Sequence, residues 1–172
     1  MEALEAVRGQ EAPLAYVKRV TLAKLAAAQA QLGANDAVLV ADTTVALGRS
    51  ILGKPETAQA NAVMLARLQG QTHRVLTAVA LGIGAARWQA VSCSYVQFAA
   101  LSEAQIAAYA ASGEGWDKAG GYAIQGHAAA FVVQMRGNYT GIVGLPLHPT
   151  AQLLRAAGVL PALELNPSKL TI

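Results

Sequence analysis

Hydrophobic and polar positions along this chain follow two periods, which predict helices and strands. From Pro13 to residue 31 the apolar residues return every three or four positions, as on one face of a helix that Gly33 would end. Shorter apolar or alternating runs predict a strand pair or a bent strand around Asp42 at residues 37–47, and strands at residues 75–83 and 88–98. The last two of these strands would form a hairpin, because a turn-like segment separates them.

Capping and turn residues locate the remaining elements. Thr57 would cap a helix over residues 58–69, which Gly70 would end. Ser102 and Gln105 form a capping box before a helix that ends near Gly113. A glycine-rich loop, a strand and a short last helix would follow, at residues 113–121, at residues 128–135, and between Pro149 and Gly158. Helices and strands without repeats or linkers predict one α/β domain over residues 1–172.

The composition favours a protein with a substantial core and a small anionic ligand. Hydrophobic residues fill 54% of the 172 positions and charged residues only 13%, about half the usual share. The net charge is +3 and the lysines stand singly, which argues against nucleic acid as a partner. The apolar stretches fall short of a membrane span, so no membrane partner is expected.

Two features favour a cytoplasmic location. The lone Cys93 cannot form an internal disulfide, and its alternating surroundings predict a buried, reduced thiol. The first residues, Met-Glu-Ala-Leu-Glu, are acidic and lack the apolar segment of a signal peptide.

The clearest chemical signal is a carboxylate that directly follows an apolar run. Residues 37–41 lead into Asp42 and Thr43, and ligands of open α/β sheets bind beyond the carboxyl ends of strands. Lys54 follows within a Gly-Lys-Pro segment, and Lys118 within Asp-Lys-Ala-Gly-Gly. An acid, lysines and glycine turns suit a phosphate-bearing substrate with a divalent metal. Taken alone, Asp42 has a plainer interpretation as a turn residue that binds nearby amides.

The other polar candidates each have two interpretations. Lys24 lies on the apolar side of its helix, where it either extends past the core to solvent or binds phosphate. Lys54 is a solvated loop residue or a point charge for phosphate, and Lys118 is a phosphate ligand or the partner of Asp117 in a surface ion pair. Gln125 is a structural amide or a group that donates to and accepts from a base edge.

Several enzyme classes are excluded by missing motifs. The three histidines lack metal-ligand spacing, which argues against a zinc site. The chain also lacks Gly-x-Ser-x-Gly, a complete Walker loop, Gly-x-Gly-x-x-Gly and Cys-x-x-Cys. A metal-assisted phosphate hydrolase is an enzyme class that these missing motifs do not exclude.

The motifs, taken in order, resemble the Maf family of nucleoside triphosphate pyrophosphatases over nearly the whole chain. They are Tyr16-Val-Lys-Arg19 to Lys24, Ala41-Asp-Thr43, Gly53-Lys-Pro55, Thr72-His73 to Thr77, Asp117-Lys-Ala-Gly120, Tyr122-Ala-Ile-Gln-Gly126 and Gly144-Leu-Pro146. The resemblance implies a Maf/ITPase-like fold with a mixed central sheet flanked by helices. It also implies hydrolysis of a nucleoside triphosphate to the monophosphate and pyrophosphate with Mg²⁺ or Mn²⁺, often by a homodimer.

The resemblance also implies roles for individual residues. Asp42 would be the catalytic proton acceptor or a metal ligand, and Glu5 falls where the family has an acidic residue that would share the metal. The triphosphate would be held by three lysines: Lys24, Lys54 and Lys118. Thr43 and Gln125 would select the base, and this Thr/Gln pair is typical of the branch that acts on dTTP and UTP. The branch that acts on 7-methyl-GTP carries Gln and Glu at these positions.

The chain departs from the family pattern at its beginning. Family members open with a strand and a Ser-x-Ser-Pro-Arg-Arg loop that has no counterpart here, so we expect a truncated domain without the N-terminal strand and its phosphate-binding arginines. A catalytically impaired nucleotide-binding remnant and a regulator of septum formation are therefore alternative interpretations. Three smaller departures, Ala78, Gly115 and Ala128, are expected to be mild, with Gly115 loosening the loop that carries Lys118.

Overall fold

The computed structural model describes residues 2–33 and 36–160. Its helices are α1 (Glu2–Glu5), α2 (Pro13–Gln29), α3 (Ala58–Leu68), α4 (Glu103–Ser112), α5 (Tyr139–Val143) and α6 (Leu147–Ala156), with short 3₁₀ turns at Ala119–Gly121 and His127–Phe131. Its strands are β1 (Val38–Leu47), β2 (Ser50–Leu52), β3 (Thr72–Ile83), β4 (Ala86–Phe98) and β5 (Val132–Arg136).

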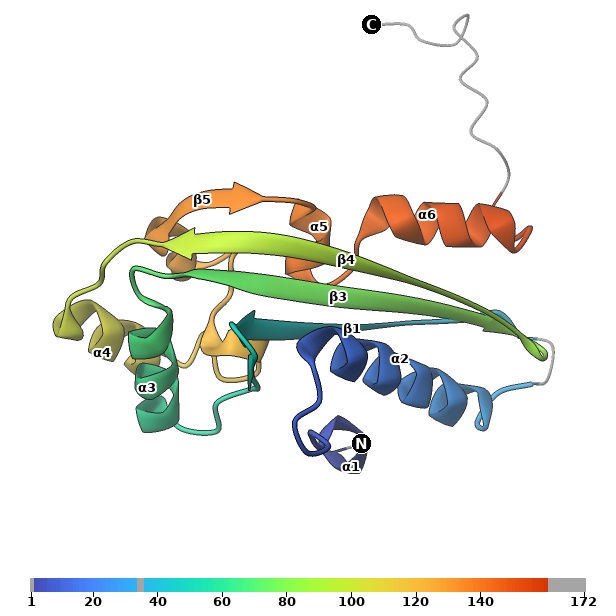
Figure 1. The fold of residues 1–172 in the computed structure, drawn as a ribbon, viewed down its shortest axis with the longest axis horizontal. Helices are drawn as coiled ribbons and strands as arrows, with labels where there is room; N and C mark the ends of the chain where they lie inside the picture. The colour runs from blue at the N-terminus through green and yellow to red at the C-terminus, as the bar shows by residue number, and fades with distance from the viewer. Residues whose placement is uncertain (1, 34–35, 161–172) are drawn as a thin grey trace, which may run out of the picture.

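The five strands form one sheet in the order β2-β1-β3-β4-β5, and its long strands run side by side through the molecule (Figure 1). The predicted α/β class is confirmed. All four strand pairings of the described residues are antiparallel, which corrects the expected mixed sheet. Neighbouring strands joined by tight turns must run in opposite directions, and β1–β2 and β3–β4 are joined in this way.

Local signals located the helices well. Pro13 occupies the first turn of α2, and Thr57 caps α3 by accepting from the amide of Ala60. Both hydrogen bonds of the predicted capping box between Ser102 and Gln105 are present at the start of α4. The prediction of a strand over residues 128–135 was partly wrong, because a 3₁₀ turn occupies residues 127–131 and the strand begins at residue 132.

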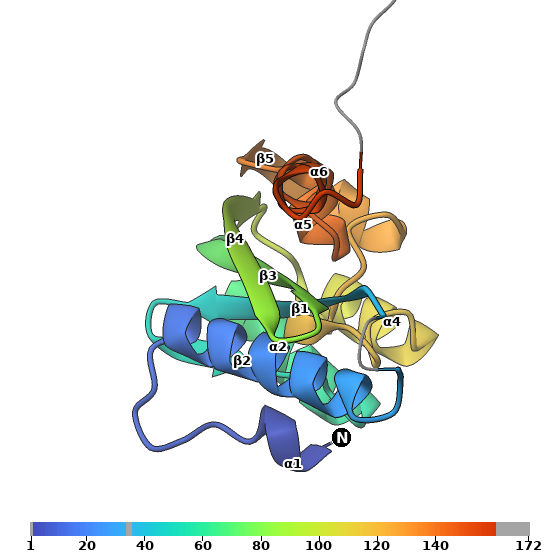
Figure 2. The same ribbon diagram turned by 90° about the vertical axis from the view of Figure 1, so that its right-hand side faces the viewer.

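Helices cover the two faces of the sheet differently. α2 packs over β1 and β3 on one face, while α5 and α6 pack against β3 and β4 on the other side of the sheet (Figures 1 and 2). The buried stripe of α2 contains Tyr16, Val17 and Val20, which pack on Leu76 and Ala78 of β3. Burial of this stripe orients the helix, so the next turn of the same stripe brings Lys24 to the sheet.

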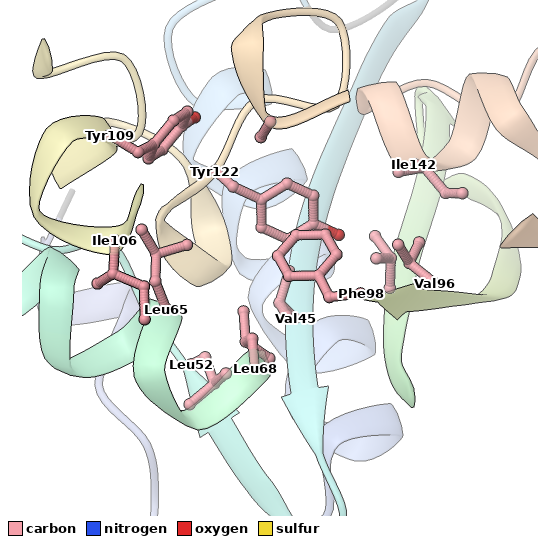
Figure 3. Packing of buried hydrophobic residues seen from close by; sticks show 12 residues of the cluster. Val45, Leu52, Leu65, Leu68, Val96, Phe98, Ile106, Tyr109, Tyr122 and Ile142 are labelled. Carbon is pink, nitrogen blue, oxygen red and sulfur yellow. The ribbon is translucent and has the colours of Figure 1, made fainter. Parts of the chain in front are cut away.

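The larger core cluster lies on the face opposite α2, between the sheet, α3 and α4, and it holds the loop before β5 in place. Phe98 and Tyr122 pack edge-to-face with ring centroids 4.8 Å apart (Figure 3). His73 is 1% exposed, and its Nε2 lies 2.7 Å from the hydroxyl of Tyr122. This packing ties the segment around Tyr122 to β3 and β4 and so positions one wall of the pocket described below.

Cys93 is exposed, so the prediction of a buried thiol was wrong. Its neighbours Ser92 and Ser94 point to the opposite, covered face of β4. Cys93 shares a face with its pairing partner Leu76, but α2 packs mainly on β1 and β3, so the helix covers Leu76 and leaves Cys93 exposed.

Within residues 2–33 and 36–160, no helix combines the length and the apolar character needed to cross a membrane.

Candidate active site

A cavity of about 320 Å³ lies beside the middle of β1, and the predicted site residues meet there. Its lining includes the predicted catalytic residue Asp42 and all the residues predicted to bind the substrate: Lys24, Thr43, Lys54, Lys118 and Gln125. Glu5 lines a smaller adjoining cavity that shares Asp42 and Lys54 with the larger one. The fold therefore brings together residues that are far apart in the sequence.

Asp42 lies in the middle of β1, which corrects the prediction that it follows the end of a strand. It pairs with Ala78 of β3, whereas β2 pairs with β1 only at residues 45–47. Among the described residues, the other edge of β1 beside Asp42 and Thr43 has no strand partner. Successive side chains of a strand point to opposite faces, so a ligand at this open edge can be reached by Asp42 from one face and by Thr43 from the other.

Two carboxylates share one ammonium group at the α2 side of the pocket. Lys24 Nζ lies 2.5 Å from Asp42 Oδ1 and 2.7 Å from Glu5 Oε1. The three side chains are largely shielded, with exposures of 11% for Asp42, 18% for Lys24 and 32% for Glu5. Of the two interpretations of Lys24, extension to solvent is wrong, because its ammonium is paired inside the site.

The Tyr-Val-Lys-Arg segment of α2 holds Glu5 in place. The hydroxyl of Tyr16 donates to the carbonyl of Glu5 at 2.8 Å, and Arg19 Nη1 donates to the carbonyl of Leu4 at 3.1 Å. Glu11 orients the guanidinium of Arg19 through two hydrogen bonds of 2.8 Å. Sequence reasoning assigned Tyr16 and Arg19 no role, although the motif that contains them was recognised.

The shared ammonium controls the charge of both carboxylates. Burial raises the pKa of Asp42, and the hydrogen bond from Lys24 opposes this increase. The hydrogen bond from Lys24 lowers the pKa of Glu5, although burial acts against it. Burial lowers the pKa of Lys24, but its bonds to both acids outweigh this effect and leave the pKa above its usual value. Lys24 therefore stays charged and helps to keep Asp42 ionised.

Two loops place Lys54 and Lys118 on the same side of the pocket. The amide of Gly120 donates to the carbonyl of Gly53 at 2.9 Å, and Asn61 of α3 donates to the carbonyl of Gly121 at 2.7 Å. Gly120 has a φ of 77°, and a side chain there would press against Val45 of β1. These close backbone approaches join the Gly-Lys-Pro loop to the glycine-rich loop.

The two lysines differ in their partners. Lys118 Nζ lies 2.7 Å from Asp117 Oδ2, but both side chains are well exposed, so this surface pair contributes little energy and can open. Lys54 forms no ion pair with any of the residues that the structure describes. Both ammonium groups can therefore turn toward a phosphate in the cavity.

Gly115 tightens its loop, which corrects the expectation that it loosens it. An added Cβ at this position would overlap the backbone carbonyl of Gly121. The amide of Lys118 donates to the carbonyl of Gly115 at 3.1 Å, which closes the turn. Gly53, by contrast, has free space around it and no left-handed φ, so its backbone imposes no need for glycine.

The pocket also has apolar walls and polar groups that suit a base. Its walls include Ile124, Ile142 and Val143, with Thr43 and Gln125 among them. Thr43 Oγ1 lies 2.9 Å from Thr77 Oγ1 on the neighbouring strand. The side chain of Gln125 is exposed and makes no hydrogen bond to another described residue, so its amide can turn toward a ligand.

Glu114 anchors the segment that carries Gln125, a role that sequence reasoning missed. Its Oε1 accepts from the hydroxyl of Tyr109 at 3.0 Å, and its Oε2 accepts from the amide of His127 at 3.1 Å. Tyr109 in turn accepts from the amide of Ala123 at 3.0 Å. Both ends of residues 123–127 are thus tied to α4 and the loop that follows it. No local sequence signal indicates this contact, since its partners are many residues apart.

The carboxylate pair has the chemistry of a partial metal site. The described residues contain no group of three or more His, Cys, Asp or Glu side chains that could hold a metal ion. Mg²⁺, however, is often bound by one or two carboxylates together with substrate phosphates. Because Glu5 and Asp42 already flank a cation, the ammonium of Lys24, a divalent cation fits this donor pair when phosphate oxygens complete its ligands.

Fold and site together define a small α/β protein with a cavity that is lined by a carboxylate and three lysines. Residues 2–157 match the family described as Maf-like protein, and the chain belongs to that family.

Three similar proteins carry the name dTTP/UTP pyrophosphatase. The one from Polaromonas sp. is 56% identical over 162 residues, which is 92% of this chain and 80% of that protein. The one from Albidiferax ferrireducens is 56% identical over 161 residues, covering 91% and 80% of the two chains. The one from Cupriavidus metallidurans is 52% identical over 162 residues, covering 92% and 81%. The expected absence of the N-terminal strand stays a prediction.

Proposed function

We propose that this protein hydrolyses dTTP or UTP between the α and β phosphates and releases the nucleoside monophosphate and pyrophosphate. The observation that carries the proposal is the joint lining of one cavity by a partly buried carboxylate, three lysines and the polar pair Thr43 and Gln125. Support also comes from relatives named dTTP/UTP pyrophosphatase, which match more than nine-tenths of the chain.

The lysines would bind and orient the triphosphate. Lys54 and Lys118 approach the cavity from the two joined loops, while Lys24 approaches from α2. An ammonium acts on phosphate as a point charge, so three of them around one cavity stabilise the negative charge of the substrate and of the leaving pyrophosphate. The ammonium of Lys24 uses two of its three hydrogens on Asp42 and Glu5, so the third would reach a phosphate.

Asp42 would accept the proton of the attacking water. The water oxygen forms a bond to the α phosphorus, the bond from that phosphorus to the bridging oxygen breaks, and pyrophosphate leaves with the bond electrons. Lys24 helps to keep the carboxylate in its ionised, proton-accepting form. General-base assistance typically contributes about 10²–10⁴-fold, so positioning and electrostatics must provide the rest.

A divalent cation would be held by Asp42 and Glu5 together with substrate phosphates. When bound, the cation supplies additional neutralisation of phosphate charge. Mg²⁺ and Mn²⁺ both prefer oxygen ligands of this type. A cytoplasmic location and a homodimer stay predictions from the sequence.

The test measures pyrophosphate release by the purified chain with dTTP and UTP in the presence of Mg²⁺ or Mn²⁺. Asp42→Asn keeps the shape of the side chain and removes its charge, so turnover should fall by at least about 100-fold. The control is Asp36→Asn, a change in an exposed turn where the side chain only accepts from the amide of Gly33, and it should keep wild-type turnover.

Two results would contradict the proposal. If Asp42→Asn kept wild-type turnover, Asp42 would have no part in the reaction. Tight binding of dTTP without any pyrophosphate release by the wild-type chain would instead favour the nucleotide-binding remnant.

A further inference from the structure

We propose that Thr77 fixes the direction of the Thr43 hydroxyl, so that Thr43 presents only acceptor lone pairs to the pocket and selects bases that carry a hydrogen at N3. Uracil and thymine meet this condition and cytosine does not. The inference rests on the proposed function, because it concerns the base end of the same pocket.

Three oxygen atoms form a hydrogen-bonded chain beside the pocket. Thr43 Oγ1 lies 2.9 Å from Thr77 Oγ1, which lies 2.6 Å from the carbonyl oxygen of Gly141. A hydroxyl carries one hydrogen, and a carbonyl oxygen can only accept. Thr77 therefore donates to Gly141, and the hydrogen between the two threonines must come from Thr43.

The fold holds this chain in place. Thr43 and Thr77 are direct pairing partners in the β1–β3 ladder, and Thr77 is 0% exposed. Gly141 belongs to α5. Its amide donates to Asn138 Oδ1 at 2.8 Å, which holds this turn of the helix in place. A side chain at Gly141 would crowd Ser92 of β4, so α5 and the sheet approach closely at this point.

Reversal of the chain is unfavourable. If Thr43 turned its hydrogen toward the pocket, Thr77 would have to donate to Thr43. Thr77 Oγ1 and the carbonyl oxygen of Gly141, which lie 2.6 Å apart, would then face each other without a hydrogen. If Thr77 kept its donation to Gly141, the two threonine oxygens would face each other in the same way. Two buried acceptor oxygens that face each other without a hydrogen between them are costly.

The consequence for a base follows from the donors and acceptors of its edge. The edge of uracil or thymine used in base pairing has one donor, the N3 hydrogen, whereas N3 of cytosine is an acceptor. Thr43 can accept from the N3 hydrogen of uracil or thymine. With cytosine, two acceptors, Thr43 Oγ1 and N3, would face each other. A site built to pair with a particular polar group rejects analogues that lack it.

Gln125 cannot provide this discrimination by itself. Its amide has a donor end and an acceptor end, and rotation exchanges the two. Since no other described residue holds this amide in one orientation, it can match either pyrimidine. The fixed partner of the pair is Thr43, and Thr77 is the positioning residue that fixes it.

The test compares kcat/KM for dTTP and dCTP in variants of Thr77. Thr77→Val removes the hydroxyl with little change of shape, so Thr43 becomes free to donate to N3 of cytosine, and the dTTP/dCTP ratio should fall about tenfold. Thr77→Ser keeps the hydroxyl and should keep the ratio. Thr150→Val removes a similarly buried hydroxyl of α6, which donates to the carbonyl of Pro146 just before the helix, and it should leave the ratio unchanged.

The outcomes separate this inference from the proposed function. If the wild type cleaves dTTP but Thr77→Val keeps the wild-type ratio, the role of Thr77 is wrong and the proposed function stands. A wild type that cleaves dTTP and dCTP equally well also overturns the inference alone. If no nucleoside triphosphate is cleaved, both fail. Thr77→Ala provides the same comparison if Thr77→Val does not fold.

Discussion

The buried His73 should make the fold sensitive to acid. Burial lowers the pKa of this side chain from 6.5 to about 4. The unfolded chain would take up a proton near pH 6.5 and the folded chain only near pH 4, so stability is fully present above pH 6.5 and is lost as the pH falls between these values. At about 1.4 kcal/mol per pKa unit, the full effect is about 3 kcal/mol.

The assay is urea unfolding of the wild type and of His73→Phe at about pH 7.5 and pH 4.5. Phe cannot titrate, so the variant should lose about 3 kcal/mol less than the wild type when the pH is lowered. In thermal melts this difference corresponds to roughly 6–12 °C for a domain of this size. The variant starts from lower stability at neutral pH, because the hydroxyl of Tyr122 loses its partner.

His148→Gln is the matched control, since His148 is exposed. It should keep the acid sensitivity of the wild type. The reasoning is refuted if His73→Phe and the wild type lose the same free energy of unfolding between the two pH values. In that case the acid sensitivity comes from the carboxylates and not from the buried imidazole.

Three further predictions concern the pocket. Lys24→Met removes the hydrogen bond that opposes the burial-raised pKa of Asp42, so the acid limb of the kcat/KM profile should move to higher pH; an unmoved limb would separate Lys24 from that ionisation. Lys54→Ala should weaken binding of a triphosphate much more than binding of a nucleoside, and calorimetry that finds equal losses would indicate a structural lysine. Gly115→Ala should destabilise the fold by about 1–3 kcal/mol, because its Cβ would overlap a backbone carbonyl across the loop. Gly53→Ala, where space is free, should leave stability unchanged in the same melts.

The sequence by itself determined the local elements of this protein. Pro13 starts α2, and Ser102 with Gln105 starts α4, because caps depend on residues a few positions apart; α2 ends at Gln29, before the expected Gly33. Alternation and turn residues predicted the β3–β4 hairpin for the same reason. The chemical types of the pocket residues were also readable, since charge and hydrogen-bonding capacity belong to each residue wherever it lies.

Only the tertiary structure decided where those groups stand and what they face. Asp42 was expected beyond a strand end but lies inside β1, because the strand continues through it to pair with β3. Cys93 alternates like its covered neighbours, yet it is exposed because α2 packs mainly on β1 and β3 and contacts β4 near Gln89 and Val91. Local sequence patterns describe the period of an element, whereas coverage depends on which distant element packs on it.

The same reason explains the contacts within the pocket. Thr43 and Thr77 become neighbours through strand register, and the carbonyl of Gly141 completes their chain from a helix still further along the sequence. Glu5 meets Lys24 only after α1 has folded back onto α2. The direction of a hydroxyl and the charge of a buried carboxylate are properties of such assembled neighbours, so they arise only when strand pairing and helix packing bring distant segments together.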